Sequence, residues 1–275
     1  VPEHFNLPWH MAIEEGAFED RGINIVWADV PEGTGKMCEM LRNGETDIAI
    51  ILTEGIIKDI ATGNPSKIVQ AYVESALLWG IHVAGNSSFT DLHQLNGKKA
   101  AISRFGSGSH LMAYVNAKES GWDMDKLNFE TVNTLDGAIG ALTNGAADYF
   151  MWEHFTTKPL VDDGTFRWLG DCPTPWPCFV IAVRDAFLTE NKAVIKYILE
   201  VINIYTKDFK NIPSIDKTIA NRYGQKIEDV KEWLSLTRWG QKQLSPEIVE
   251  TVQLALKSLG LLDRIESYKT ITTNL

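Results

Sequence analysis

Cysteine is scarce in this chain of 275 residues, which contains only Cys38, Cys172 and Cys178. Because three is an odd number, a full disulfide framework is excluded. Cys172 and Cys178 flank a proline-rich segment, where they either pair or stay reduced, and two reduced thiols are the more ordinary interpretation. Hydrophobic residues make up 44% of the chain, so its cores need no disulfide or metal staple.

Long apolar runs are also missing, because the longest covers only residues 48–52. A membrane-spanning helix needs about 20 apolar residues, so we expect no membrane span. Clusters of lysine or arginine are absent as well, and the formal net charge is −10. An acidic surface repels phosphate backbones, which argues against a nucleic-acid partner. No signal peptide is visible, and this leaves the compartment open.

Motifs for catalysis, metals and nucleotides do not occur. The chain has neither H-E-x-x-H nor C-x-x-C, and its six histidines show no ligand spacing. Its glycine-rich segment has Leu111 where a dinucleotide loop needs its third glycine, and no G-x-S-x-G or Walker pattern is present. We therefore expect no catalytic residue, no metal site and no cofactor.

Strand-like and helix-like runs alternate through the first two thirds of the chain. This alternation is typical of βαβ units and predicts an α/β fold. Helices are expected at residues 36–42, 55–61, 109–119 and 136–142. Strands are expected at residues 23–27 (continuing to 30), 48–52, 68–73, 77–84, 99–103, 129–132 and 147–152. After residue 191 the pattern predicts a helical C-terminal segment.

One internal repeat has the pattern L-x-N-G-x-x-D. It begins at Leu41 and again at Leu142, 101 residues later, and each copy precedes a predicted buried strand. The pattern describes a helix end, a glycine turn and an aspartate before a strand. Any connection from a helix to a strand can look this way. Its occurrence in two βα series favours two similar lobes with a cleft between them.

The candidate ligand contacts lie directly after predicted strands. In open α/β sheets, ligands bind beyond the carboxyl ends of strands, and helix N-termini there suit anionic or carbonyl groups. Arg104 adds a planar charged fork, although its loop can also be a simple capped helix start. The residues of these strand exits are Thr34, Gly35, Thr53, Glu54, Arg104, Ser107, Gly108, Ser109, His110, Trp152 and Glu153.

Aromatic residues near these loops complete the predicted site, and they are Phe5, Trp79 and Trp176. Buried aromatics are more often core than ligand platforms, but a few aromatic walls with sparse polar groups are usual in small-molecule sites. Glu54 and Glu153 favour an amine, amide or ring N–H, and we prefer this interpretation to acid/base catalysis. The expected partner is a small anionic or heteroaromatic ligand.

The order and spacing of four segments resemble the type 2 periplasmic binding proteins of ABC importers. Residues 2–18, ending in E-x-G-x-F, and residues 22–25 resemble the start of the nitrate/sulfonate/taurine and thiamine-pyrimidine branch. Residues 41–49 and 95–99 resemble its L-x-x-G-x-x-D-[IV]-A and L-x-G-K-[KR] segments. The chain also resembles a smaller fungal branch whose role is not settled.

This resemblance implies two lobes, each a mixed sheet flanked by helices, that close over a ligand by hinge motion. Lobe one would comprise residues 1–83 and 182–275, and lobe two residues 84–181. The resemblance implies that the ligand contacts come from the loops already named and that Asn6 is a further contact. An ABC importer is the implied partner if the protein is exported. The location is then periplasmic or extracytoplasmic in a bacterium, and cytoplasmic for the fungal branch.

The sequence thus predicts a solute-binding protein without catalysis. Two alternatives remain open. One is an enzyme like the eukaryotic thiamine-pyrimidine synthases, which resemble this fold but are marked by a cysteine-rich run that this chain lacks. The other is a sensor or interaction protein that uses ligand-driven closure as its signal.

Overall fold

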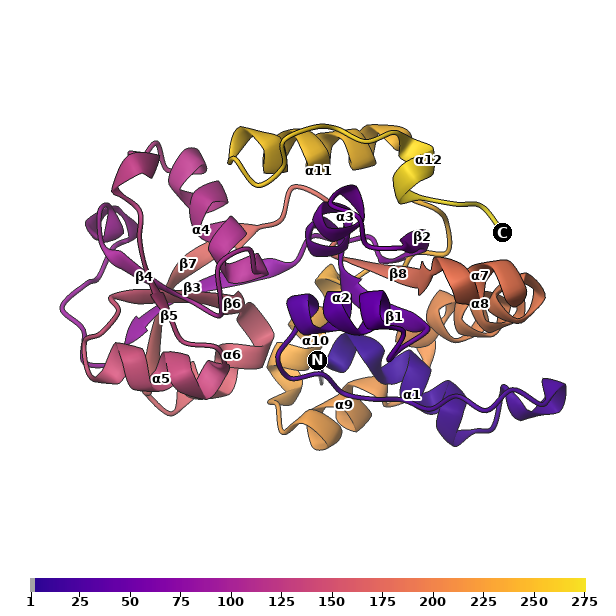
Figure 1. Ribbon diagram of the computed structural model, residues 1–275. Helices are drawn as coiled ribbons and strands as arrows, with labels where there is room; N and C mark the ends of the chain where they lie inside the picture. The colour runs from indigo at the N-terminus through magenta and orange to yellow at the C-terminus, as the bar shows by residue number, and fades with distance from the viewer. Residues whose placement is uncertain (1–2) are drawn as a thin grey trace. The chain divides into compact units, whose positions relative to one another are not determined.

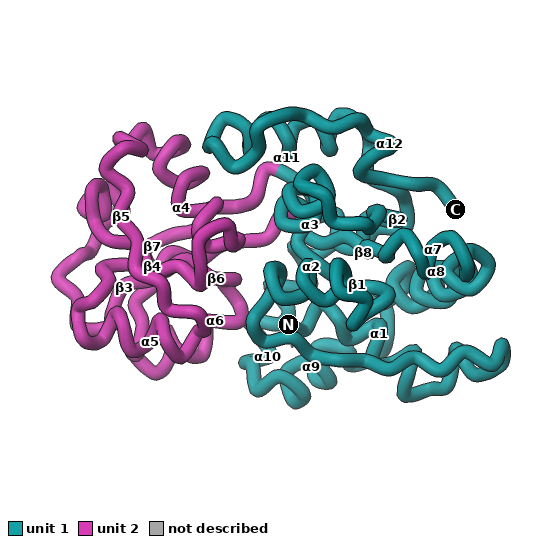
Figure 2. The backbone as a smooth tube through the Cα atoms, viewed as in Figure 1, with its two compact units in different colours: residues 1–75, 176–275 teal, residues 76–175 magenta. Residues whose placement is uncertain are grey.

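The computed structural model describes residues 3–275, which form two compact units (Figure 2). Unit 1 comprises residues 1–75 and 176–275, and unit 2 comprises residues 76–175. The two boundaries lie eight and six residues before those expected from the sequence. The reason is strand pairing, because β3 (Leu78–Ala84) pairs within the sheet of unit 2 and β8 (Phe179–Arg184) within that of unit 1.

Unit 1 is built on a three-stranded sheet in the order β1-β8-β2, with β8 antiparallel to both neighbours. The other strands are β1 (Ile48–Leu52) and β2 (Ser66–Val73). The helices of unit 1 are α1 (Leu7–Glu14), α2 (Thr34–Asn43), α3 (Thr53–Ala61), α7 (Asp185–Glu190), α8 (Lys192–Lys207), α9 (Ile215–Tyr223), α10 (Ile227–Leu236), α11 (Pro246–Ser258) and α12 (Tyr268–Ile271). The predicted helical C-terminal segment is confirmed, and its last helices α11 and α12 pack against α3 (Figure 1).

Unit 2 contains a five-stranded mixed sheet in the order β5-β4-β6-β3-β7. Its further strands are β4 (Lys99–Ile102), β5 (Asn128–Thr131), β6 (Tyr149–Glu153) and β7 (Phe166–Pro173). Its helices are α4 (Gly108–Glu119), α5 (Leu135–Thr143) and α6 (His154–Asp162). Helix α4 covers one face of the sheet, and α5 and α6 cover the other (Figure 1). The core beneath α5 includes the fully buried rings of Phe150 and Phe166.

The two L-x-N-G-x-x-D segments have the same local structure. Gly44 follows the end of α2 with φ of 72°, and Gly145 lies in the turn after α5 with φ of 75°. Both angles are left-handed, a conformation that a side chain disfavours. Asp47 accepts a hydrogen bond from Arg184 Nε at 2.6 Å. Asp148 accepts one from the backbone N–H of Lys99 at 2.8 Å. Each aspartate therefore ties the start of its strand to a neighbouring strand.

The strand predicted at residues 23–27 is not formed. Residues 23–30 belong to no strand or helix, although the side chains of residues 23–28 alternate between half-buried and exposed. An apolar alternating sequence forms a strand only where a partner edge is available. Strand β1 pairs with β8 and with no other strand of the described chain, so this segment has no pairing partner there.

The three cysteines are buried and form no disulfide in the described chain. No helix within residues 3–275 is long and apolar enough to cross a membrane.

Candidate ligand-binding site

The predicted contacts of unit 1 gather at one edge of its sheet. Strand β1 ends at Leu52, and α3 begins directly with Thr53 and Glu54. Because β8 runs antiparallel to β1, the segment that leads into β8 lies at this same edge. The Thr53 N–H donates to the Cys178 carbonyl at 3.0 Å, and its hydroxyl donates to the Pro177 carbonyl at 2.6 Å. Thr53 thus joins the start of α3 to the segment before β8.

Glu54 is the central side chain of this edge. It is 1% exposed, and its Oε2 accepts a hydrogen bond of 2.8 Å from Trp176 Nε1. Its second oxygen, Oε1, is buried and has no hydrogen-bond partner within residues 3–275. Buried polar atoms are nearly always hydrogen-bonded, so an unpaired carboxyl oxygen marks a position where a donor is needed. Glu54 and Trp176 were both predicted from the sequence as ligand contacts, and the structure brings these two side chains together.

Burial raises the pKa of the Glu54 carboxyl from 4.5 to about 7. The hydrogen bonds from the backbone and from Trp176 oppose this shift, but they are weaker than the cost of removing the charge from water. Glu54 therefore changes charge near neutral pH. A ligand that donates a hydrogen bond to Oε1 would favour the ionised form.

The start of α2 lies against the start of α3 through a contact at Gly55. A Cβ atom placed on Gly55 would lie 2.2 Å from Cγ2 of Thr34, far inside van der Waals contact. Glycine at this position therefore lets the N-termini of both helices, including Thr34 and Gly35, meet at one edge. Gly55 was not identified as a site residue, since its role depends on a contact between segments far apart in sequence.

Phe5 lies near the start of β8, at this same edge. The Phe5 ring is buried against Phe179 and Trp233, with ring centroids at 5.3 and 5.1 Å. Its carbonyl accepts hydrogen bonds from Tyr72 and Trp239 at 2.7 and 3.2 Å. Phe5 therefore has a core role in the structure. Asn6 precedes α1 and is also buried.

The predicted contacts of unit 2 also share one sheet edge. Strands β4 and β6 are parallel neighbours, so their carboxyl ends lie together. Strand β3 is antiparallel to β6, which places the start of β3 at that edge. The register pairs Trp79 directly with Glu153 and Gly80 with Trp152. The loop from Arg104 to His110, which follows β4, belongs to the same edge.

Within the Arg104 loop, the polar side chains bond mainly to one another. Ser107 caps α4 by accepting from the His110 N–H at 3.3 Å. The Ser109 hydroxyl accepts from the Ser103 N–H at 3.0 Å and lies 3.1 Å from the Ser107 hydroxyl. His110 Nδ1 accepts from the Gly106 N–H at 3.0 Å. This network supports the capped-helix interpretation, in which the hydroxyls shape the loop and the backbone around Gly108.

Glu153 caps its own helix. Its Oε2 accepts from the Thr156 N–H at 2.6 Å and from the Thr156 hydroxyl at 2.7 Å. Burial raises the pKa of the Glu153 carboxyl, while the hydrogen bonds from Thr156 oppose the shift. Glu153 is therefore a structural cap as well as a candidate contact.

The tryptophans at this edge differ in their packing. The Trp152 ring stacks on Phe150 at 5.3 Å and adjoins the hydrophobic core beneath α5. The Trp79 ring meets Trp152 edge-on at 6.3 Å and is 4% exposed. Trp79 Nε1 is buried without a hydrogen-bond partner in the described chain. Trp79 thus contributes a buried donor, as Glu54 contributes a buried acceptor in unit 1.

Near this edge, sequence reasoning missed a histidine–aspartate pair. His154 Nδ1 lies 2.8 Å from Asp171 Oδ1, which also accepts from Trp168 Nε1 at 3.0 Å. His154 is the first residue of α6, and Asp171 lies in β7, a strand that was not predicted. No group of three or more potential metal ligands occurs within residues 3–275.

Three comparisons with known proteins bear on this fold. Residues 79–172 match the family model of the Ca3427-like periplasmic binding proteins. A search of curated protein sequences found no significant match.

Solved structures are similar over nearly the whole chain. The CA3427 gene product of Candida albicans, which defines a family with the generic periplasmic binding protein fold, has a TM-score of 0.86 at 29% identity, over 98% of this chain and 90% of that chain. The alkanesulfonate-binding protein SsuA of Xanthomonas axonopodis pv. citri, bound to MOPS, has a TM-score of 0.83 at 18% identity, over 99% and 96%. A zinc-bound ligand-binding component of an ABC-type import system from Staphylococcus aureus has a TM-score of 0.79 at 13% identity, over 99% and 94%.

The topology and these comparisons agree. Both sheets are flanked by helices, and the similar structures are a fungal protein with the periplasmic binding protein fold and bacterial ligand-binding proteins. The chain therefore has a type 2 periplasmic-binding-protein-like fold, and the comparisons include the fungal Ca3427 branch, as the resemblance predicted.

Proposed function

We propose that this protein binds a small organic ligand without converting it, and that Glu54 is the principal polar contact. The observation that carries the proposal is the unpaired Oε1 of Glu54, which is buried at the carboxyl end of β1. Polar atoms left unpaired in a buried position cost about 1–3 kcal/mol, so a ligand donor at Oε1 would gain this amount. The binding roles of the similar structures support the proposal.

The chemistry of the two edges favours a particular class of ligand. Glu54 Oε1 needs a donor such as an amine, an amide or a ring N–H. Trp79 Nε1 needs an acceptor, and Arg104 suits a carbonyl or anionic group. A heteroaromatic compound that carries both a ring N–H or amino group and an oxygen acceptor meets these needs. A simple sulfonate offers acceptors only, and its charge would be repelled by ionised Glu54.

We further propose that the Glu153 edge of unit 2 contributes contacts when the ligand binds, with hinge closure. Both connections between the units start from the edges that carry the candidate residues. The first connection follows β2 and leads to Trp79, and the second follows β7 and contains Trp176. The Leu77 N–H donates to the Thr174 hydroxyl at 2.9 Å, so the two connections lie side by side there. A pair of short connections of this kind suits a hinge.

A thermal-shift screen tests the proposal. We expect aminopyrimidines and related heteroaromatics to raise the melting temperature, and simple alkanesulfonates to have little effect. Glu54→Gln should abolish the rise, while Glu200→Gln, a control at an exposed position of α8, should retain it. Binding should strengthen as pH increases through about 7, because ionised Glu54 accepts the ligand's hydrogen bond.

Two further readouts complete the experiment. Small-angle scattering with and without ligand should show compaction if the hinge closes. Mass spectrometry should recover the ligand unchanged; a converted ligand, or a modified histidine, would instead favour the enzyme alternative. Binding that is insensitive to Glu54→Gln would overturn the assignment of this residue. The proposal does not depend on an ABC import partner.

A further inference from the structure

The second connection between the units contains the segment 173–177, whose sequence is Pro-Thr-Pro-Trp-Pro. The boundary between the units falls inside it, between Pro175 and Trp176. A proline ring fixes φ and removes the backbone N–H, and a residue that precedes a proline is restricted to extended conformations. The segment therefore has few free backbone torsions, and we call it the proline connection.

Backbone hydrogen bonds hold both ends of the proline connection. In unit 2, the Thr174 N–H donates to the Leu77 carbonyl at 2.9 Å, and the Leu77 N–H donates to the Thr174 hydroxyl at 2.9 Å. In unit 1, the Cys178 N–H, directly after the segment, donates to the Ser75 carbonyl at 3.2 Å. The first connection is thus bonded to the second at one point in each unit.

Trp176 lies between these two points, with a proline on either side. Its side chain is 4% exposed, and its Nε1 donates to Glu54 Oε2 at 2.8 Å. The Thr53 hydroxyl, one residue before Glu54, donates to the Pro177 carbonyl at 2.6 Å. The start of α3 therefore holds both the Trp176 side chain and the peptide group that follows it. The bond to Glu54 restrains the torsions that the prolines leave free.

The Glu54 carboxyl group links this hydrogen bond to the proposed ligand contact. Oε2 accepts from Trp176, while Oε1 has no partner in the described chain. A carboxylate shares its negative charge between both oxygens, so a donor at Oε1 that favours the ionised form also makes Oε2 a better acceptor. Hydrogen bonds to an ionised group are roughly twice as strong as those between neutral groups. A ligand at one oxygen therefore strengthens the bond at the other.

Charged side chains do not interfere with this link. Helices α2, α11 and α12 pack against α3, yet no lysine, arginine, aspartate or glutamate within residues 3–275 contributes to the shifted pKa of Glu54. Helix α2 does bring a titratable thiol to the start of α3, because Cys38 Sγ lies 4.0 Å from the Gly55 carbonyl oxygen and donates to it. The charge of Glu54 itself therefore sets the strength of the Trp176 hydrogen bond.

We propose that Trp176 is a positioning residue that couples Glu54 to the proline connection: a ligand donor at Oε1 strengthens the Trp176 hydrogen bond at Oε2 and so holds the connection in one conformation. This role rests on the proposed function, because it takes Glu54 as the ligand contact. It differs from the role predicted from the sequence, in which Trp176 contacts the ligand directly. Coupling of this kind is reciprocal, so a connection held in that conformation also favours the ligand.

Hydrogen exchange of the connection amides tests the coupling. The amides of Leu77, Thr174 and Cys178 donate the hydrogen bonds described above, so their exchange reports on the connection. Saturating cytosine, a heteroaromatic probe with an amino group, a ring N–H and a carbonyl, should slow their exchange by about 10-fold in the wild type. The same probe should not slow it in Trp176→Phe, which keeps an aromatic ring but has no N–H.

Trp176→Phe should also bind cytosine more weakly near neutral pH. The variant loses a hydrogen bond that lowers the pKa of Glu54, so less of the carboxyl is ionised at a pH of about 7. We expect affinity to decrease about fivefold there and to recover at higher pH, where Glu54 ionises without the bond. A purely structural role for Trp176 would reduce affinity equally at every pH.

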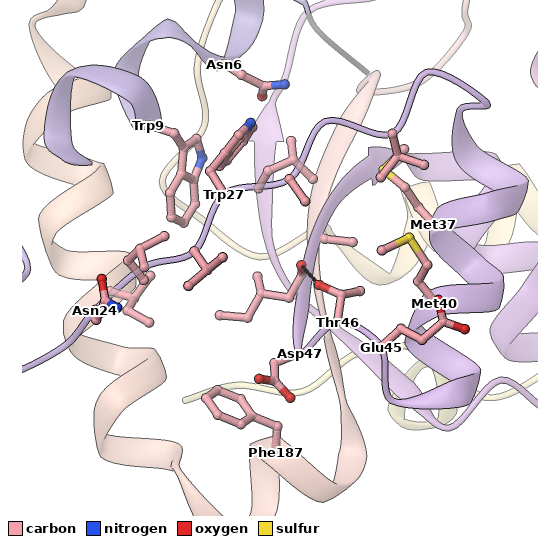
Figure 3. Close-up of a pocket in the computed structure, with 18 of the residues that line it drawn as sticks. Asn6, Trp9, Asn24, Trp27, Met37, Met40, Glu45, Thr46, Asp47 and Phe187 are labelled. Carbon is pink, nitrogen blue, oxygen red and sulfur yellow. Dashed lines mark hydrogen bonds between the residues drawn. The ribbon is translucent and has the colours of Figure 1, made fainter. Parts of the chain in front are cut away.

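Trp27→Phe is the matched control. Trp27 Nε1 also donates to a carboxylate of unit 1, Asp29 Oδ1, at 3.0 Å. Trp27 lines a cavity of about 450 Å³ beside the first half of β1, which neither Glu54 nor Trp176 lines (Figure 3). The same chemical change is thus made away from the coupling. Trp27→Phe should bind cytosine and slow the exchange of the connection amides as the wild type does.

A second measurement needs no ligand. The indole N–H resonance of Trp176 can be identified by its absence from Trp176→Phe. It should shift downfield as the pH rises through about 7 in the wild type, because Glu54 ionises there, and should not shift in Glu54→Gln. Protection of the connection amides, corrected for intrinsic exchange, should increase over the same pH range in the wild type only.

The possible outcomes separate the coupling from the proposed function. Equal slowing by cytosine in the wild type and in Trp176→Phe would overturn the coupling and leave Glu54 as the ligand contact. Failure of cytosine to bind, with an indole resonance and amide protection that follow pH, would support the coupling and count against the proposed ligand class. An indole resonance that ignores pH would overturn the coupling, and so would a cytosine effect that is lost in Trp27→Phe.

Discussion

The two βα junctions that follow the L-x-N-G-x-x-D segments begin alike and end differently. Both have a helix, a left-handed glycine and an aspartate that anchors the strand. At the strand exits, however, the residue 101 positions after Glu54 is Phe155, and the residue 101 positions before Glu153 is Leu52. The two glutamates are thus not equivalent positions of a duplicated unit.

This offset of the glutamates explains their different environments. Glu153 is the N-cap of α6, where its carboxylate reaches the N–H of Thr156. Glu54 is already inside α3, two residues beyond the N-cap position at Leu52, and its carboxyl contacts Trp176 instead. The repeat therefore duplicates the architecture that begins each strand, while the chemistry at each exit is specific to one unit.

The largest expected difference between the two glutamates is in the pH dependence of stability. Because the pKa of Glu54 is raised in the folded state, the native state holds its proton more tightly than the unfolded chain. The contribution of Glu54 to the free energy of unfolding should therefore decrease as pH rises from 4.5 to about 7, by up to about 3 kcal/mol. In urea unfolding over this range, the free energy of the wild type relative to Glu54→Gln should show this decrease.

Glu153→Gln is the control for that experiment. Burial raises the pKa of Glu153 as well, but the hydrogen bonds from Thr156 stabilise its ionised form. Removing Glu153 should therefore alter the pH dependence less than removing Glu54 does. Parallel pH curves for the wild type and Glu54→Gln would contradict the environment described for Glu54.

The Gly55 contact is the next largest expected effect and belongs to unit 1 alone. Gly55→Ala should destabilise the protein by about 2 kcal/mol, because the new methyl group overlaps Thr34 Cγ2. Thr34→Ser removes that methyl group and should restore most of the loss in the double variant. Gly140→Ala is the matched control, since a Cβ there has no neighbour within 4 Å. Thermal unfolding is measured for the wild type, the two single variants, the double variant and Gly140→Ala, and additive effects of the Gly55 and Thr34 substitutions would refute the contact.

The cap at Glu153 should have a smaller effect. Glu153→Ala removes the acceptor for the Thr156 N–H and should cost about 1 kcal/mol of stability. Glu153→Gln retains an oxygen acceptor and should cost less. Chemical denaturation of the two variants provides the measurement, and equal losses would indicate that the cap depends on charge rather than on the hydrogen bond.

The effects of replacing Asp47 and Asp148, the aspartates of the two L-x-N-G-x-x-D segments, should be no larger than that of the Glu153 cap. Asp47→Ala breaks a partly exposed ion pair with Arg184 and should cost about 0.5 kcal/mol. Asp148→Ala leaves the Lys99 N–H without its side-chain acceptor and should cost about 1 kcal/mol. Similar small losses in denaturation experiments would support the equivalence of the two segments. A large loss at only one aspartate would break it.

Much of the fold could be predicted from the sequence because the signals are local. The helices around Met37 and Leu142 and the strands after Asp47 and Asp148 follow from periodicity, glycine turns and apolar runs. Strands β7 and β8 were not predicted, because their place in the sheets depends on partners far away in sequence. Residues 23–27 have a strand-like sequence but no partner in the described chain, which periodicity cannot reveal.

The candidate site was predictable in position and less so in detail. The rule that ligands bind at the carboxyl ends of strands selected Thr53, Glu54 and the loop after β4. The same rule also selected Ser107 and Ser109, whose hydroxyls are engaged within their own loop. Hydrogen-bond partners depend on distances of a few tenths of an ångström, and residue types do not specify such distances.

The sequence by itself determined the α/β alternation, the helical C-terminal segment and the chain positions of the strand exits, since each depends on neighbours in the chain. Only the tertiary structure decided that Glu54 keeps one buried oxygen unpaired while Glu153 caps its helix. Burial and the geometry of contacts between distant segments set both outcomes, from Trp176 beside Glu54 to Thr34 against Gly55.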